Sequence, residues 1–133
     1  MQRQLDDNTL VDGQIRPDEV ARLKELGVTL VVNNRPDNED EGQPTSDEIE
    51  AAARAAGLDY RHVPIVRGMG PSDVEAMHAA GDGKLFAFCR SGHRSTLAWA
   101  VAKNEDGVPR EELERCAAEA GYSLDAVAHL LND

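Results

Sequence analysis

Hydrophobic and polar positions follow two periods along this chain, which predicts strands that alternate with helices. The run from Val28 to Asn33 is apolar and rich in β-branched residues, as is typical of a parallel strand covered on both faces. The helical segments begin near Pro or Ser and end near Gly. The predicted strands are Asn8 to Gln14, Val28 to Asn33, Leu58 to Pro64 and Lys84 to Phe88, and the predicted helices are Pro17 to Leu26, Asp47 to Ala56 capped by Ser46, Ser72 to about Ala80, Ser95 to Ala102, Pro109 to Ala120 and Ser123 to Leu131. Repeated β–α units in a short chain predict an α/β fold with a mainly parallel sheet and helices on both faces.

The length and the charge of the chain limit the kinds of protein to which it can belong. Its 133 residues predict a single domain over residues 1–133, which would bury about two-thirds of the surface of the unfolded chain. No apolar run approaches the roughly 20 residues of a membrane span, and the polar start has no signal-peptide character. The formal charge of −11 argues against nucleic acid or an anionic membrane as a partner. The two cysteines, Cys89 and Cys116, lie far apart in different contexts, and a reducing cytoplasm fits them best.

The segment from Cys89 to Ser95 carries the strongest chemical signal. It follows an apolar strand directly and opens a helix. Loop amides and the first unpaired N–H groups of that helix would converge at the carboxyl end of the strand, where parallel sheets bind ligands. The same field favours thiolate over thiol, so we predict that Cys89 is an accessible nucleophile. The simpler alternative is a structural cysteine beside an ordinary strand-to-helix turn.

The other residues of this segment suit a small tetrahedral anion. Arg94 offers a planar fork of donors that can hold an oxyanion through two hydrogen bonds. Gly92 allows the sharp turn that points amides inward, and the amides of Ser91 to Ser95 would complete the anion-binding loop. Arg90 is expected to point outward and to shape the mouth of the pocket. These features predict a catalytic site for an anionic group at Cys89.

Several further residues have two candidate roles each. Ser95 can donate to the Cys89 sulfur, cap the following helix, or do both. His93 is expected to tune substrate access or the charge of the thiolate. Arg35 follows a strand and could reach the anion site, or it could pair with the acidic run from Asp37 to Glu41. The histidines show no ligand spacing, so neither a metal nor a cofactor is predicted.

The chain resembles the phosphatase-like domain of bacterial beta-lactamase-hydrolase-like proteins, a family related to dual-specificity tyrosine phosphatases. The resemblance runs from about Asp7 to Leu131. The stretches that carry it are Gly13-Gln14, Val31 to Asp37, Gly42 to Pro44, the helix up to Gly57, Tyr60 to Pro64, and Phe88 to Ser95. The resemblance implies a cysteine-phosphatase-like three-layer α/β sandwich.

Two departures from tyrosine phosphatases bear on function. Those enzymes place five residues between the cysteine and the arginine, whereas here four residues separate Cys89 from Arg94, as in a rhodanese loop. The phosphatase aspartate that acts as general acid normally follows the Val-Pro strand, but here the first acid in that region is Asp73. Asp73 could serve if the loop folds back; otherwise it is a carboxylate in the first turn of a helix.

Three functions follow from these observations. The favoured one is sulfane-sulfur transfer through a Cys89 persulfide, with thiosulfate or a persulfide as the small anionic substrate. The alternative is hydrolysis of a phosphate ester through a cysteinyl-phosphate. The third is a non-catalytic oxyanion-binding module. The resemblance also implies a partner of the persulfide-dioxygenase type, because related domains occur fused to such modules.

Overall fold

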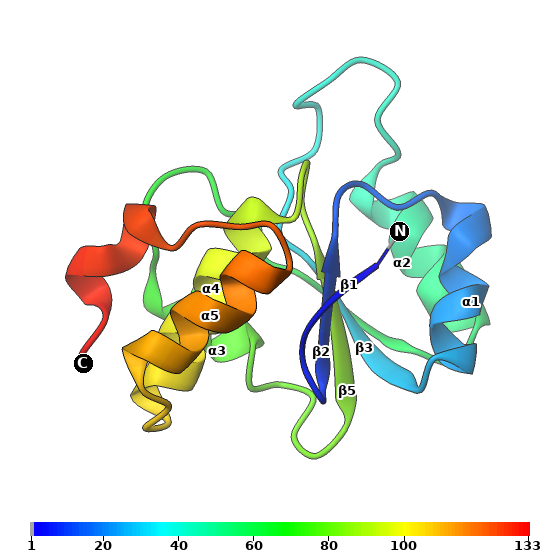
Figure 1. Cartoon of the computed structure of the whole chain (residues 1–133). Helices are drawn as coiled ribbons and strands as arrows, with labels where there is room; N and C mark the ends of the chain where they lie inside the picture. Colours follow the sequence, from blue (N-terminus) through cyan, green and yellow to red (C-terminus); the bar gives the residue numbers. More distant parts are fainter. Residues whose placement is uncertain (1) are drawn as a thin grey trace.

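The chain folds into a central sheet covered by helices on both faces, and the computed structural model describes residues 2–133 (Figure 1). The strands are β1 (Arg3–Asp6), β2 (Thr9–Asp12), β3 (Val28–Asn33), β4 (Asp59–His62) and β5 (Lys84–Phe88), in the spatial order β1-β2-β5-β3-β4. Only β1 pairs antiparallel, with β2, and the remaining pairs are parallel. The predicted mainly parallel α/β fold is therefore confirmed. Within residues 2–133, no helix has both the length and the apolar character needed to cross a membrane.

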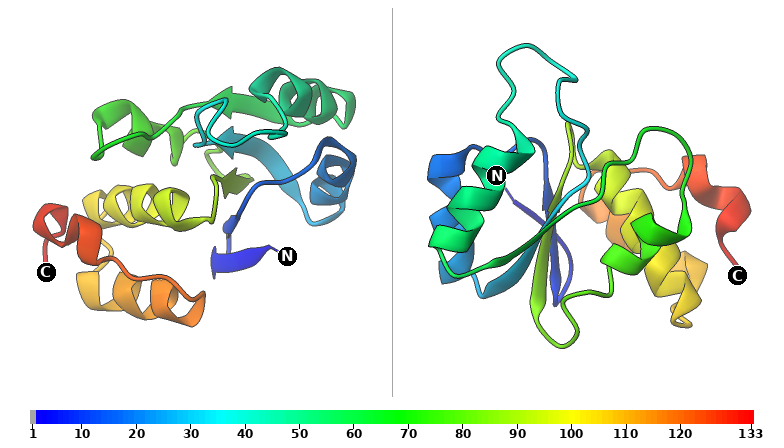
Figure 2. Two further views of the ribbon diagram at one scale, coloured as in Figure 1. Left: turned by 90° about the horizontal axis from the view of Figure 1, so that it is seen from above. Right: turned by 180° about the vertical axis from the view of Figure 1, so that it is seen from behind.

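The helices form two layers. On one face lie the 3₁₀ turn η1 (Pro17–Glu19), α1 (Val20–Glu25) and α2 (Ser46–Ala55), and on the other lie α3 (Pro71–Ala76), α4 (His93–Glu105), α5 (Arg110–Glu119) and the 3₁₀ helix η2 (Asp125–Leu130) (Figures 1 and 2). Each layer packs on its own apolar cluster. These helices occur where the sequence predicted helical segments, within a few residues at the ends.

The sequence predicted a single strand at the amino terminus where the structure has a hairpin. Strand β1 precedes β2, and the pair turns through Asp7 and Asn8. In β1 only Leu5 is buried, so an alternating pattern is too short to detect there. The predicted strand Asn8 to Gln14 corresponds to β2 alone.

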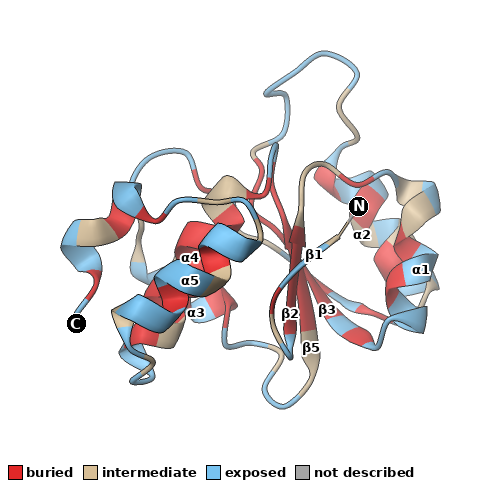
Figure 3. Cartoon of the chain, viewed as in Figure 1, coloured by how far each residue is buried: buried red, intermediate tan, exposed pale blue. Residues whose placement is uncertain are grey.

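Strand β5 lies at the centre of the sheet and ends at the cysteine loop. Leu85 and Ala87 face the cluster under α3, α4 and α5, while Phe86 and Phe88 face the cluster under α1 and α2. Such alternation is the two-residue period of a strand. Helix α4, which follows the loop, is buried along most of its surface (Figure 3). Cys89, the residue after β5, is thus close to two buried elements, β5 and α4.

The cap of α2 differs by one residue from the prediction. Thr45 is the N-cap: its Oγ1 accepts a hydrogen bond from the Glu48 amide, and the Glu48 carboxylate accepts one from the Thr45 amide, both at 3.2 Å. Ser46 is the first helical residue, and its hydroxyl pairs instead with the Tyr60 hydroxyl at 2.7 Å. Thr45 prevails because Glu48 stands three residues after it and closes a capping box.

Candidate active site

The carboxyl ends of β2, β3, β4 and β5 meet at one edge of the sheet. There the Asn34 amide donates to the Phe88 carbonyl at 2.8 Å, and the Ile65 amide donates to the Asn34 carbonyl at 2.9 Å. The Cys89 amide donates to the Asp12 carbonyl at 3.4 Å. The loop between β3 and α2 projects beyond this edge (Figure 1). The segments that follow β2, β3 and β4 therefore lie beside the end of β5, where Cys89 stands.

The sulfur of Cys89 lies inside its loop. The Gly92 amide donates to Sγ at 3.1 Å, and Gly92 adopts a left-handed φ of 91° that points this amide inward. Cys89 has 0 % exposed surface, so the predicted accessible thiol is wrong for this conformation. It is buried because β5 is central and the loop folds around the sulfur. A reacting molecule has to displace groups around the mouth of the loop.

Arg94 is held by a residue that the sequence analysis did not single out. Its Nη1 and Nη2 donate to the two carboxylate oxygens of Glu39, each at 2.8 Å, and Nη1 also donates to the Ile65 carbonyl at 2.8 Å. The hydrogen bonds to Glu39 raise the pKa of Arg94 against the opposing effect of burial, and the negative charge at Cys89 adds to the increase. The cation of Arg94 is therefore fixed beside the sulfur.

Arg35 and Arg90 share the neighbouring acid, Asp40. Arg35 is 4 % exposed and donates to Glu39 at 2.9 Å, to Gln14 at 3.0 Å and to Asp40. Arg90 is exposed, as predicted for the mouth of the pocket, and pairs with Asp40 at 3.1 Å. Of the two roles offered for Arg35, the structure shows pairing with the acidic run, although the side chain is buried rather than on the surface.

Ser95 has neither of its predicted roles. Its hydroxyl donates to the side-chain oxygen Oδ1 of Asn34 at 2.8 Å, and the side-chain nitrogen Nδ2 of Asn34 donates to the Val63 carbonyl at 3.0 Å. The N-cap of α4 is Gly92, so Ser95 lies within the first turn. A hydroxyl has a single proton, which here goes to Asn34 rather than to the Cys89 sulfur. Ser95 and Asn34 join α4 to β3 and β4 beneath the site.

One wall of the cysteine loop comes from the segment after α5, which has no recognisable motif in the sequence. The Tyr122 hydroxyl donates to the Ser91 carbonyl at 2.9 Å. Its ring stacks on His93 with centroids 6.3 Å apart, and the guanidinium of Arg3 lies 5.3 Å from its centre. Burial raises the pKa of Tyr122, which keeps the phenol protonated as a donor. His93 also contacts the Ser123 carbonyl at 3.1 Å, so it faces this wall.

Asp73 stands at the start of α3 and not at the sulfur. Its Oδ2 accepts a 2.8 Å hydrogen bond from the Gly70 amide, which is the role of a carboxylate in the first turn of a helix.

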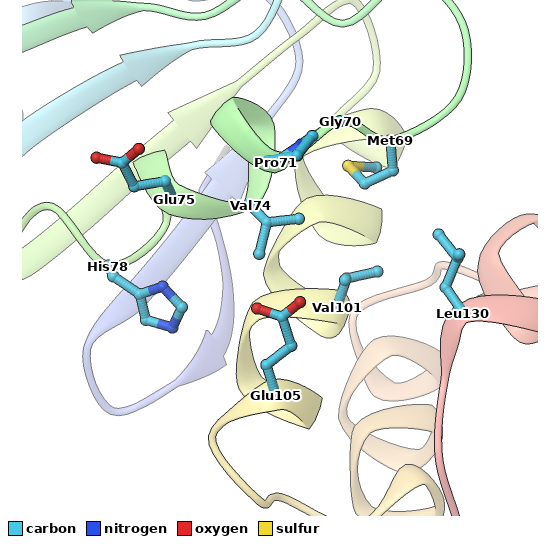
Figure 4. A pocket seen from close by; sticks show the side chains of 9 residues that line it. All are labelled: Met69, Gly70, Pro71, Val74, Glu75, His78, Val101, Glu105 and Leu130. Carbon is cyan, nitrogen blue, oxygen red and sulfur yellow. The ribbon is translucent and has the colours of Figure 1, made fainter.

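A separate cavity of about 460 Å³ lies between α3, α4 and η2. Figure 4 shows the apolar side chains Val74, Val101 and Leu130 that line it, together with the carboxylates of Glu75 and Glu105. Within residues 2–133, no group of three or more His, Cys, Asp or Glu side chains is placed to hold a metal ion.

A mainly parallel α/β sandwich with a cysteine–arginine loop after its central strand defines a phosphatase-like protein. The chain belongs to the family of the phosphatase-like domain of beta-lactamase hydrolase-like proteins, whose sequence profile matches residues 2–106. A beta-lactamase hydrolase-like protein from Xylella fastidiosa (strain Temecula1 / ATCC 700964) is 31% identical over 125 residues, which cover 90% of this chain. The chain spans only 29% of the length of that relative.

Two solved structures place the fold among phosphatases. A candidate phosphatase from Neisseria meningitidis Z2491 superposes with a TM-score of 0.80 at 29% identity, covering 96% of this chain and 94% of that one. PTPMT1 in complex with PI(5)P superposes with a TM-score of 0.69 at 17% identity, covering 97% of this chain and 93% of that one. The predicted family resemblance is thereby confirmed.

Proposed function

We propose that this protein is a sulfurtransferase in which Cys89 carries a sulfane sulfur as a persulfide. The observation that carries the proposal is that Asp73, the acid expected from the sequence, and Glu39, the carboxylate bound to Arg94, are both held in roles other than proton donation. Asp73 is bound to the Gly70 amide at the start of α3. The hydrogen bonds from Arg94 and Arg35 lower the pKa of Glu39 although burial works against them, so Glu39 is ionised near neutral pH. Sulfur transfer needs no such donor.

The chemical step requires only groups present in the loop. The Cys89 thiolate attacks the outer sulfur of thiosulfate or of a low-molecular-weight persulfide, and a new S–S bond forms. The old S–S bond breaks, and its electron pair leaves with sulfite or with the donor thiolate, which is a stable anion. An acceptor thiolate then attacks the outer sulfur of the Cys89 persulfide and releases the Cys89 thiolate. The Gly92 amide at 3.1 Å from Sγ supports the sulfur anion in each state.

The size of the loop supports the same choice. Four residues separate Cys89 from Arg94, and the Gly92 amide is directed at the sulfur itself. A cradle for a phosphoryl group needs several amides directed at oxygens beyond the sulfur. A smaller loop suits a single added sulfur atom better.

Phosphate-ester hydrolysis through a cysteinyl-phosphate is the second candidate. It is favoured by the structural neighbours, one described as a candidate phosphatase and one bound to PI(5)P. This reaction would have to expel an alkoxide or phenoxide without an acid, a contribution that is worth on the order of a hundredfold or more. A non-catalytic oxyanion-binding module is the third candidate, and the burial of Cys89 is consistent with it.

The proposed setting follows from the chemistry. Cys89 and Cys116 are both free thiols, as a reducing cytoplasm would keep them. The relatives are about three times longer than the stretch they share with this chain, and a partner that oxidises persulfides, supplied as a separate or fused module, would consume the product. We propose thiosulfate or a persulfide, and not a nucleic acid or a membrane, as the molecule that is bound.

Intact mass spectrometry separates the candidates. After treatment with thiosulfate or glutathione persulfide, the wild-type protein should gain one sulfur atom, and Cys89→Ser should gain none. Cys116→Ser is the matched control and should still gain the sulfur. A protein that stays unmodified with both donors but hydrolyses aryl phosphates would instead be a phosphatase, and a protein inert in both assays that still binds sulfate would be a binding module.

A further inference from the structure

We infer that Glu39 is a positioning residue that turns the side edge of the Arg94 guanidinium, Nε–H and one Nη2–H, toward the Cys89 loop. The inference rests on the proposed function only in assuming that this loop receives an anionic group. Glu39 lies 55 residues before Arg94 in the sequence, in the loop between β3 and α2. Its contact with Arg94 is a two-bond fork that uses both carboxylate oxygens.

An account of the Arg94 donors supports this role. A guanidinium has five N–H donors in a fixed plane. In Arg94, two donate to Glu39 and one donates to the Ile65 carbonyl, each at 2.8 Å. The two that remain are Nε–H and the second Nη2–H, which are parallel and form the side edge of the plane. This edge is the fork that can hold an oxyanion.

Glu39 is itself held in place by other residues, through both its side chain and its backbone. Its Oε1 accepts a second hydrogen bond from Arg35 Nε at 2.9 Å, and the Arg35 side chain is 4 % exposed and anchored to Gln14 at 3.0 Å. The Glu39 amide donates to the Gln43 side chain at 3.1 Å, which holds the loop backbone. Because both ends of Glu39 are restrained, the orientation of Arg94 is set before any substrate arrives.

The opposite role, that of a carboxylate competing with the substrate for Arg94, predicts a different geometry. A competitor would occupy the side edge of the guanidinium or the amides of the loop. Glu39 instead takes the end-on pair of nitrogens, Nη1 and Nη2, and does not bind Nε–H. An incoming anion therefore does not have to displace Glu39.

A comparison of two charge-neutralising variants tests the inference. Glu39→Gln removes the two-bond fork, while Glu41→Gln removes the same charge from an exposed side chain of the same loop. Loss of a negative charge alone should strengthen sulfate binding slightly and equally in both variants. Misplacement of Arg94 should instead weaken sulfate binding by Glu39→Gln by about tenfold or more. The measurement is a calorimetric sulfate titration of both variants and wild type at fixed salt. Sulfate affinity in Glu39→Gln that equals or exceeds that of Glu41→Gln would overturn the inference.

Two further readouts separate positioning from other effects. Alkylation of Cys89 by iodoacetamide should become slower in Glu39→Gln, because a misplaced Arg94 stabilises the reactive thiolate less; a large increase in rate would show instead that Glu39 acts as a cover. Glu39→Asp keeps the charge but is one methylene shorter, so its sulfate affinity should fall between those of wild type and Glu39→Gln. Wild-type affinity in Glu39→Asp would overturn the inference even if Glu39→Gln failed to fold.

The sulfate titrations, combined with sulfur loading of the same proteins, distinguish failure of this inference from failure of the proposed function. If wild type accepts no sulfur from any donor but the sulfate affinities follow the predicted order, sulfur transfer fails and the positioning role stands. If wild type is loaded with sulfur and Glu39→Gln is loaded with the same maximal rate and the same half-saturating donor concentration, the positioning role fails and sulfur transfer stands.

Discussion

The hydroxyl of Tyr122 packs against Gly92, at the point where any side chain on Gly92 would begin. The same hydroxyl donates to the Ser91 carbonyl at 2.9 Å, which holds that carbonyl away from the sulfur. The Gly92 N–H belongs to the same trans peptide unit as that carbonyl and points the opposite way, inward to Cys89 Sγ at 3.1 Å. An aromatic residue from the carboxyl-terminal segment thus sets the conformation of the cysteine loop.

Gly92→Ala should lower the free energy of unfolding and weaken sulfate binding. The left-handed φ of 91° costs a residue with a Cβ roughly 1–2 kcal/mol, and the Cβ would also collide with the Tyr122 hydroxyl. Urea unfolding and a sulfate titration measure the two effects. Gly107→Ala is a suitable control, since Gly107 also has a positive φ, of 100°, but has open space around it.

Tyr122→Phe should relieve part of the cost of Gly92→Ala. Removing the hydroxyl removes the closest contact of the new Cβ but leaves the ring carbon next to it and the backbone strain, so the destabilisation by Gly92→Ala should be smaller, though not abolished, in the Tyr122→Phe background. Urea unfolding of the four proteins of this double-mutant cycle gives the coupling. Equal destabilisation in both backgrounds would show that the Tyr122 contact does not restrain the loop.

Ser95→Ala should destabilise the fold and leave the reactivity of Cys89 largely unchanged. The variant removes the hydrogen-bond donor of the buried side-chain oxygen Oδ1 of Asn34. Such a change costs about 1–3 kcal/mol. Urea unfolding measures the loss, and iodoacetamide alkylation of Cys89 measures the reactivity. A slower alkylation with unchanged stability would instead show that the Ser95 hydroxyl acts on the sulfur.

The strand, the loop and the helix around Cys89 could be predicted because each has a local signal. The alternation in β5, the glycine at position 92 and the apolar run of α4 all lie within a few residues of one another. Their order fixes the topology and hence the edge of the sheet where the loop lies. Local patterns were sufficient for this part of the site.

The partners of the loop could not be predicted because they come from distant segments. Glu39 belongs to an acidic run that, in the sequence, is indistinguishable from a solvated surface loop. Tyr122 follows a helix with a strongly polar exterior and has no motif of its own. Which acid of the run meets Arg94 depends on the path of the loop after β3, and a sequence pattern does not define that path.

Arg94→Lys should weaken sulfate binding more than Arg90→Lys does. Lysine keeps the charge but has no planar fork, so it cannot meet both oxygens of Glu39, the Ile65 carbonyl and an anion together. Arg90 is exposed and has a single ion pair in this region, with Asp40, and an exposed pair contributes little. Calorimetric titrations at fixed salt give both affinities. Similar losses in the two variants would mean that charge alone, and not the fork, attracts the anion.

The ion-pair network around Glu39 should make stability depend on pH in the acidic range. The hydrogen bonds from Arg94 and Arg35 lower the pKa of Glu39 below its usual value of 4.5, although burial works against them. A carboxyl whose pKa is lower in the folded state contributes stability that is fully present above 4.5 and is lost as the pH falls through the folded value. The difference in free energy of unfolding between wild type and Glu39→Gln should therefore be constant from about pH 7 to about pH 5 and should shrink below that. Urea unfolding of both proteins as a function of pH measures it, and Glu41→Gln separates this local effect from the general loss of negative charge. A difference that stays constant below pH 4.5 would show that the pKa of Glu39 is the same in the folded and unfolded states, and that Arg94 and Arg35 do not stabilise its charge.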